Sequence, residues 1–376
     1  MTNSIRTLPP ASSGTRRRGP LLFLTVAYLG MWAAMTPLLV TGFQREDARS
    51  GTGALEEVCI SAAMFAPAVA ALLVVRYVER TDRIRDVLAL RWPRPPSRTA
   101  RSCLSALAVP AALTAVALGL GAVTGHYPLD VRWDGLGAWA TAVLLQMLVS
   151  LPLFFGEELG WQGYLFPRLA RDGGGARLVW AYVGTGAAFA LWHLPTLLMG
   201  GQYPGRPWYL SVPAMVISCT LILPVFTWLR LRSGSVVPAV LGHAFVSTAG
   251  VGMVKAFAAP DAPLDPLHMG LTGWPGWIVT AAFVAFLALT GRLRPSTYDR
   301  GTTGYPGSGA GPGSGADPGA EDSGAGASPG AEASPGAEAG PGAEARPGAG
   351  TAVPRRVGSV RWRSSTCATS WRSPST

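Results

Sequence analysis

The sequence predicts an all-α membrane protein, a multispanning transmembrane bundle of about eight helices followed by a disordered C-terminal tail. Of its 376 residues, 49% are hydrophobic and only 14% are charged, and the mean hydropathy is +0.28. A soluble domain does not bury that much apolar surface. Apolar runs long enough to cross a hydrocarbon core of ~30 Å recur along the chain, and short arginine clusters separate them. We therefore expect a lipid bilayer around most of the chain.

The charge and the cysteines exclude other classes. The net charge is +10, but the arginines fall in short clusters between apolar runs, as topology signals do, so we expect no nucleic-acid partner. The four cysteines lie far apart and without metal-ligand spacing, at Cys59, Cys103, Cys219 and Cys367. They indicate neither a disulfide framework nor a zinc knuckle.

The first two spans follow from their length and flanks. Residues 1–19 are polar, end in a triple arginine and are expected to be a cytoplasmic segment. The apolar run 20–43 is too long for a signal-peptide core and predicts the first transmembrane helix. A second helix is expected over 54–77. It opens with Glu56 and Glu57, and an acidic pair in a first helical turn is explained by the positive end of the helix dipole.

A cytoplasmic loop and two further spans come next. Residues 80–101 are rich in arginine and proline, which is typical of a cytoplasmic loop with a short interfacial helix. The run 103–124 then crosses outward to an external loop, where His126 is expected to be solvated. The fourth run begins at Leu136, and we expect Pro152 to kink it.

Four more apolar runs complete the predicted membrane domain, 20–295. They cover 178–199, 208–229, 236–256 and 274–290. The loops expected inside are richer in arginine than their neighbours, which predicts an integral protein of the plasma membrane with both termini in the cytoplasm. After residue 296, Pro-Gly-Ala-Glu units recur, and this composition predicts a disordered cytoplasmic tail over 297–376.

Ionisable residues inside three of the runs indicate a functional site. Glu157 and Glu158 directly follow an apolar stretch, and a carboxylate at membrane depth is costly unless it is paired or faces a polar cavity. His193 and His243 lie within two later runs. At 1.5 Å per helical residue, these positions fall at overlapping depths. Phe189 stands one turn before His193 and is expected to pack beside its ring.

Helical spacing assigns neighbours to two of these residues. Glu158 shares a face with Gln162, whose amide is expected to donate a hydrogen bond to the carboxylate. His243 shares a face with Ser247, which places an imidazole and a hydroxyl together.

The cluster is compatible with more than one chemistry. A carboxylate beside a neutral imidazole can hold and deprotonate a water, and a second imidazole with a hydroxyl can stabilise an oxyanion. Glu157, His193 and His243 are equally suited to bind zinc with an open position, so no cofactor is certain and a divalent metal such as zinc stays open. The same groups also suit an interhelical hydrogen-bond network that only stabilises the bundle.

Three motifs resemble those of the CPBP family, also called ABI, which contains the type II CAAX prenyl endopeptidases and bacterial bacteriocin-processing and immunity proteins. The motifs are Glu157-Glu158-x-x-x-Gln162, Phe189-x-x-x-His193 and His243-Ala244-x-x-Ser247, and the resemblance covers a core over 136–256. It implies that Glu157 and His193 activate water, or bind metal under a metalloprotease assignment, and that His243 stabilises the oxyanion. In this chain Gln162 replaces the usual arginine, and Ser247 replaces a common asparagine.

These observations give a first hypothesis and two rivals. The first is an intramembrane endopeptidase with Glu157 as base, His193 as its partner, and His243 with Ser247 at the oxyanion. The alanine, glycine and arginine bias, with Lys255 the only lysine, indicates a high-GC bacterium, where CAAX processing is not expected. The expected substrate is therefore a peptide or another membrane protein. The main rival is a non-catalytic immunity or scaffold protein of the same fold. A transporter is a third option, against which no internal repeat is visible.

Overall fold

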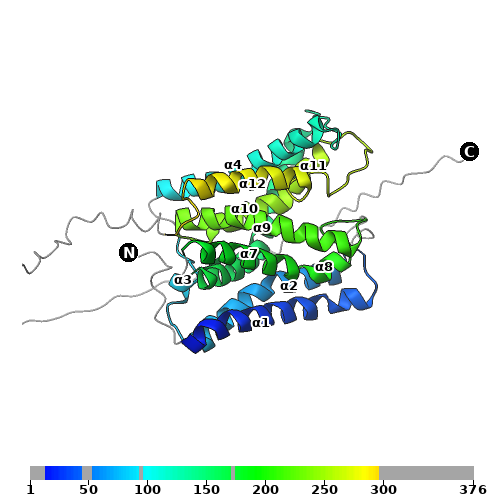
Figure 1. Cartoon of the computed structure of the whole chain (residues 1–376). Helices are drawn as coiled ribbons and strands as arrows, with labels where there is room; N and C mark the ends of the chain where they lie inside the picture. The colour runs from blue at the N-terminus through cyan, green and yellow to red at the C-terminus, as the bar shows by residue number, and fades with distance from the viewer. Residues whose placement is uncertain (1–12, 45–52, 93–95, 171–173, 296–376) are drawn as a thin grey trace, which may run out of the picture. The chain divides into compact units, whose positions relative to one another are not determined.

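The computed structural model describes residues 13–44, 53–92, 96–170 and 174–295. The expected tail and most of the expected N-terminal segment lie outside these residues. Within them the regular structure is helical, apart from an isolated bridge between Leu129 and Ala258, which confirms the all-α fold class (Figure 1). The α-helices are α1 Ser13–Val40, α2 Ala54–Leu73, α3 Ile84–Val87, α4 Pro96–Val123, α5 Leu136–Glu158, α6 Phe166–Leu169, α7 Ala176–Trp192, α8 Leu194–Leu198, α9 Trp208–Ser233, α10 Val237–Phe245, α11 Val251–Ala256 and α12 Trp274–Leu289.

Six helical segments of the described part are long and apolar enough to cross a membrane, so the chain is an integral membrane protein. They are Arg18–Val40, Ala54–Val78, Pro96–Val123, Leu136–Leu169, Trp208–Ser233 and Val237–Ala256. The other two predicted runs also form helices, but α7 has only 17 residues and α12 only 16. The expected short helix in the arginine-rich loop is α3.

In the described part of the chain, three π-helical segments interrupt the long helices, and their backbone hydrogen bonds skip one residue more than in an α-helix. They are η2 Val74–Val78, η3 Leu159–Leu165 and η4 Val246–Gly250. Helix α5 continues through Pro152, and its helical form changes only at Leu159, directly after the glutamate pair. The segment η4 similarly begins a few residues after His243. Wide turns of this kind therefore follow two of the candidate site residues.

Close backbone approaches fix the helices that carry the site. A Cβ atom on Gly160 would lie 2.5 Å from the Cβ of Pro67, and one on Gly156 would lie 2.7 Å from the Met64 carbonyl oxygen. Glycines four residues apart thus let α5 and η3 lie directly against α2, as small residues do between membrane helices. Helix α7 meets α9 in the same way, since a Cβ on Gly186 would lie 2.6 Å from the Cα of Thr220.

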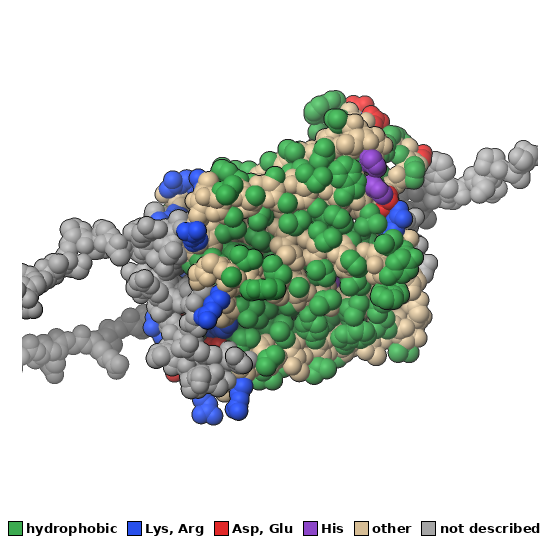
Figure 2. All heavy atoms as spheres, in the orientation of Figure 1, with side chains coloured by type: hydrophobic (Ala, Val, Ile, Leu, Met, Phe, Trp, Pro, Cys, Tyr) green, Lys and Arg blue, Asp and Glu red, His purple; other side chains and the backbone are tan. Residues whose placement is uncertain are grey.

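The two ends of the helical body differ in charge. On the face shown in Figure 2, most of the basic side chains gather at one end, and the histidine side chains lie at the other, together with most of the acidic side chains and one basic side chain. At the arginine-rich end, Arg168 pairs with Glu79, through Nε to Oε1 at 3.0 Å and Nη2 to Oε2 at 2.6 Å. Asp265, in the loop before α12, pairs with Arg206, in the loop before α9. This asymmetry agrees with a cytoplasmic arginine-rich end, which stays a prediction.

Candidate active site

Two buried carboxylates end helix α5. Glu157 is 3% exposed and Glu158 is 0% exposed. They stand between Gly156 and Gly160, so the turn that carries them is pressed against α2. Because an unpaired carboxylate at this depth is costly, the groups that surround the pair decide its chemistry.

The ring of His243, on α10, lies beside both carboxylates. Its Nδ1 is 2.8 Å from Oε1 of Glu158, and its Nε2 is 3.9 Å from Oε2 of Glu157. With Glu158 ionised, its oxygen only accepts, so Nδ1 carries the hydrogen and Nε2 is turned toward Glu157. Among the described residues, Oε2 of each glutamate is buried without a hydrogen-bond partner. The structure thus brings together Glu157, Glu158 and His243 from two spans.

His193 closes the end of α7. The helix stops there because Pro195 has no backbone N–H to donate to the carbonyl oxygen of Leu191, four residues earlier, and a new short helix, α8, begins at Leu194. Nδ1 of His193 lies 2.9 Å from the backbone oxygen of Phe189, which can only accept. As the spacing predicts, the Phe189 ring packs on the His193 ring, with centroids 4.8 Å apart. Nε2 of His193 is left as the nitrogen available for chemistry.

Aromatic rings join the two histidines into one cluster. The Phe189 ring also contacts His243, at a centroid distance of 5.6 Å, so one ring touches both imidazoles. Phe226 of α9 stacks on His243 at 5.2 Å, and Phe154 of α5 approaches it to 4.7 Å. Helices α5, α7, α9 and α10 therefore meet at this point. The sequence motifs do not include Phe154 or Phe226, and only the structure shows that their rings contact His243.

Gln162 does not support Glu158 as expected. Its Oε1 accepts a hydrogen bond from Oγ1 of Thr227 on α9 at 3.0 Å, and its Nε2 is buried without a hydrogen-bond partner among the described residues. The expectation assumed an α-helix, in which residues four apart share a face. Because η3 starts at Leu159, the wider turn changes the relative direction of the two side chains. The support that was assigned to Gln162 falls instead to His243, which binds Glu158.

Ser247 is not part of the cluster. Its side chain is exposed, whereas the ring of His243 is buried. The cause is again a π-helical segment, since η4 begins between the two residues and removes the four-residue alignment. The next residue, Thr248, is buried, and its hydroxyl donates to the carbonyl oxygen of Ala244 at 2.6 Å.

The arrangement does not fit a metal. Among the described residues, no group of three or more His, Cys, Asp or Glu side chains is placed to hold an ion. The expected set of Glu157, His193 and His243 has the right donor atoms. The two histidine rings, however, have different partners. The ring of His243 lies beside the glutamates, whereas Nδ1 of His193 bonds the Phe189 carbonyl oxygen and its ring packs on the Phe189 ring.

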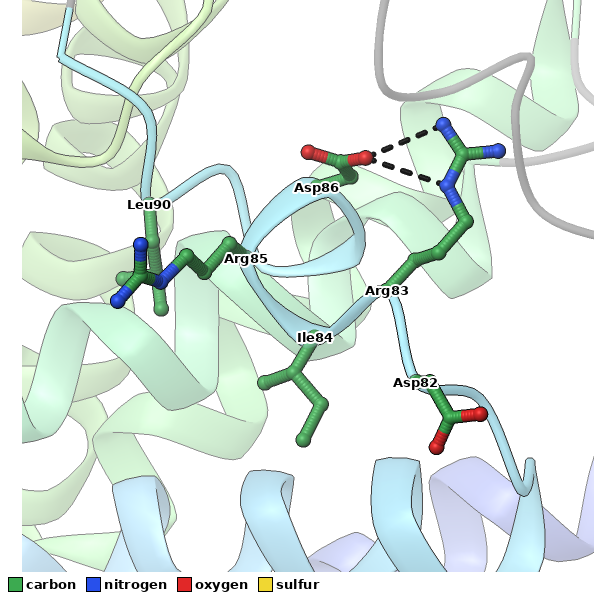
Figure 3. A pocket seen from close by; sticks show the side chains of 6 residues that line it. All are labelled: Asp82, Arg83, Ile84, Arg85, Asp86 and Leu90. Atoms are coloured by element: carbon green, nitrogen blue, oxygen red, sulfur yellow. Dashed lines mark hydrogen bonds and ion pairs between the residues drawn. The ribbon is translucent and has the colours of Figure 1, made fainter. Parts of the chain in front are cut away.

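Other polar features lie away from this cluster. Glu56 lies in the first turn of α2, as its sequence position predicts, and it is 4% exposed. An open hollow of about 590 Å³ lies at the α3 loop, where Asp86 binds Arg83 (Figure 3). There the hydrogen bonds from Arg91 and Arg83 hold the pKa of the Asp86 carboxyl below its usual value.

The loop before α12 holds a second charged group. The His268 ring stacks on the exposed His126 ring at 5.2 Å and lies 2.5 Å from Asp265 through Nδ1. Burial acts to raise the pKa of the Asp265 carboxyl, but hydrogen bonds from the Leu267 backbone N–H, His268 and Arg206 outweigh it and keep this pKa below its usual value. The contacts of Asp265 hold the loop before α12 in place, and Asp265 is far from the glutamate pair in the sequence.

A comparison with protein families agrees with the motifs. Residues 137–249 match the family described as type II CAAX prenyl endopeptidase Rce1-like. The match lies within the core expected from the motifs, 136–256, and supports membership of the CPBP family. It makes the chain similar to membrane-embedded proteases. No curated protein matches the chain.

Proposed function

We propose that the chain is an intramembrane endopeptidase that hydrolyses a peptide bond of a membrane-associated protein or peptide. One observation carries the proposal: a buried imidazole held between two buried carboxylates, with Nδ1 of His243 2.8 Å from Glu158 and Nε2 3.9 Å from Glu157. Oε2 of Glu157 is buried without a hydrogen-bond partner among the described residues, and it lies beside Nε2 of His243, so this carboxylate oxygen is free to accept a proton.

Each group then has a role in water attack. Glu157 accepts a proton from the water that attacks the carbonyl carbon, and it returns that proton to the leaving amine when the C–N bond breaks. His193, whose Nδ1 is held by the Phe189 carbonyl, presents Nε2 as a second acceptor that orients the water. The negative charge that develops on the carbonyl oxygen requires a donor.

His243 supplies that donor when its ring carries both hydrogens. Glu158 accepts the Nδ1 hydrogen bond, so it fixes the ring and stabilises the imidazolium, while the Nε2 hydrogen points into the site. Phe226 and Phe154 pack on the ring and limit its rotation. We thus assign Glu158 as the group that positions His243. The membrane in question is the plasma membrane, with the arginine-rich end and both termini in the cytoplasm.

The test is cleavage of a peptide library by the purified full-length protein in detergent, with Glu157→Gln as the matched inactive variant. Wild type is expected to cleave a subset of peptides, and Glu157→Gln to cleave them at least about a hundredfold more slowly. Glu57→Gln, a carboxylate change in the first turn of α2, is the control and should keep activity. Adding a chelator examines the metalloprotease alternative directly. Equal activity of wild type and Glu157→Gln would remove the proposal and favour a scaffold or immunity role.

A further inference from the structure

Part of the loop between α2 and α4 is buried in the helical body. We call residues 80–90, which include α3, the α3 segment. Within it, Val87, Leu88 and Ala89 are 2%, 0% and 1% exposed, whereas loops ordinarily run over the surface. Figure 1 shows α3 at the end of the body at which Figure 2 shows most of the basic side chains. The buried part of the α3 segment therefore enters the bundle from the arginine-rich end.

This buried part contacts both elements that carry the glutamate pair and His243. The carbonyl oxygen of Ala89 accepts the backbone N–H of Val236, the residue before α10, at 3.0 Å. The carbonyl oxygen of Leu88 would lie 3.1 Å from a Cβ atom on Gly163 of η3, the segment that directly follows the glutamate pair. Along α10, His243 comes seven residues after Val236, about 10 Å. The α3 segment thus fills the space between η3 and the start of α10, close to the candidate active site.

The backbone of the α3 segment is strained at two positions. Arg80 has a φ of 51° and Ala89 a φ of 53°, in the left-handed region, where the Cβ atom crowds the following carbonyl oxygen. Among the described residues other than glycine, one more has a positive φ, Asp261. Backbone strain persists only where the surrounding contacts impose it, and it gathers at segments that switch between conformations. Release of the α3 segment would relax both positions.

The hydrogen bonds of the α3 segment allow it to move as one piece. The N–H groups of residues 88–90 donate to carbonyl oxygens of residues 84–86, at 2.8–3.2 Å. These bonds stay formed when the segment moves, whereas the bond from Val236 to Ala89 breaks. Side chains of the segment line the open hollow of about 590 Å³, which leaves room on that side (Figure 3).

The candidate active site needs a movement of this kind. Glu157, Glu158, His193 and His243 are 0–8% exposed, so a peptide main chain reaches them only after part of the protein is displaced. The α3 segment contacts η3 and α10 and belongs to neither. Its displacement opens the space between them and leaves the catalytic groups in place.

We propose that the α3 segment is a gate, closed in the conformation described here, that swings outward about Arg80 and Ala89 to admit the substrate from the arginine-rich end. The proposal rests on the proposed function and adds the route of entry. Closing the gate buries Val87 and Leu88 and strains the two pivots. Because the strain opposes the apolar burial, the open form stays accessible.

The first experiment follows opening by hydrogen exchange of the Val236 N–H in the protein without substrate, since this group loses its partner when the gate opens. Arg80→Gly and Ala89→Gly remove the strain of the closed form. Each should slow this exchange by about threefold to tenfold. Asp261→Gly is the matched control, because it removes the same kind of strain from the loop before α12. It should leave the exchange of the Val236 N–H unchanged.

The second experiment measures peptide cleavage by the same variants. Because kcat/KM is proportional to the open fraction, Arg80→Gly and Ala89→Gly should lower it by the factor found in exchange. Leu88→Ala weakens packing that only the closed gate makes, so it should raise both exchange and kcat/KM per folded molecule. Asp261→Gly should change neither.

The outcomes separate a gate from a fixed support. Unchanged Val236 exchange in both Arg80→Gly and Ala89→Gly overturns the gate, whether or not the protein cleaves peptides. Slower exchange with wild-type kcat/KM also overturns it, because the movement then does not admit the substrate. Lower kcat/KM in folded Leu88→Ala assigns the segment to static support of η3 and α10. If wild type cleaves no peptide, the proposed function fails separately, and exchange alone decides whether the α3 segment opens.

Discussion

Replacement of Gly160 by alanine should disturb both the fold and the site. The added Cβ would lie 2.5 Å from the Cβ of Pro67 and 2.9 Å from its carbonyl oxygen. Neither neighbour is the end of a flexible side chain, and carbon atoms pack at about 3.5 Å or more, so η3 has to move from α2 by about 1 Å. Overpacking of this kind typically costs about 1–3 kcal/mol of stability.

The same displacement acts on the chemistry. Gly160 stands two residues after Glu158, whose hydrogen bond to His243 is 2.8 Å long, and a shift of about 1 Å takes that pair beyond hydrogen-bond distance. Misplacement of catalytic groups on this scale lowers rates by about a hundredfold. Gly160→Ala should therefore lose activity by more than its loss of folded protein accounts for.

The assay combines thermal unfolding in detergent with cleavage rates per folded molecule. Gly137→Ala on the same helix is the matched control, since a Cβ there meets nothing within 4 Å. The control should keep wild-type stability and activity. If Gly160→Ala unfolds and cleaves like Gly137→Ala, then the close α2 contact neither holds the helix nor positions the carboxylates, and the reasoning fails.

Three other changes probe separate parts of the structure. Glu158→Gln removes the carboxylate that orients His243 and should lower kcat by about 10²–10⁴-fold with little change in KM, measured by steady-state cleavage; an unchanged kcat would contradict the positioning role. Thr227→Val removes the hydroxyl bonded to Gln162 and should lower stability by about 1 kcal/mol in thermal unfolding, whereas no loss would mean that this hydrogen bond contributes nothing. Asp265→Asn should destabilise the protein by about 1 kcal/mol at neutral pH. Because the folded pKa of Asp265 is lowered, its contribution is present above the ordinary value of about 4 and is lost as pH falls through the folded pKa, so wild type and variant should converge in acid; a constant difference from neutral pH to pH 3 would refute this.

The membrane helices and the site acids were predictable because a membrane span has to be apolar, so both the spans and the ionisable residues within them can be identified from the sequence. Long apolar runs give spans directly, and an ionisable side chain such as Glu157 or His243 stands out within them. Helical rise then placed these residues at a common depth. The structure brings Glu157, Glu158 and His243 together, with Phe189 between the two histidines.

The neighbours on each helix were not predictable in the same way. The expected partners Gln162 and Ser247 were placed by four-residue spacing, and a π-helical segment follows each anchor residue and changes the face. The wider turn of a π-helix cannot be recognised in an apolar sequence, because the residue types do not change there. The pairing of Glu158 with His243, and the contact of Thr227 with Gln162, join residues far apart in the chain and depend on how the helices pack.

The short helices α7 and α12 have a consequence for water. With 17 and 16 residues they span about 25 Å, less than the ~30 Å thickness of an average hydrocarbon core, and both pack on α9. Such hydrophobic mismatch is met by local thinning of the bilayer. Thinning at α7 would bring the aqueous boundary closer to His193, at the end of this helix, and would shorten the path of a hydrolytic water through lipid.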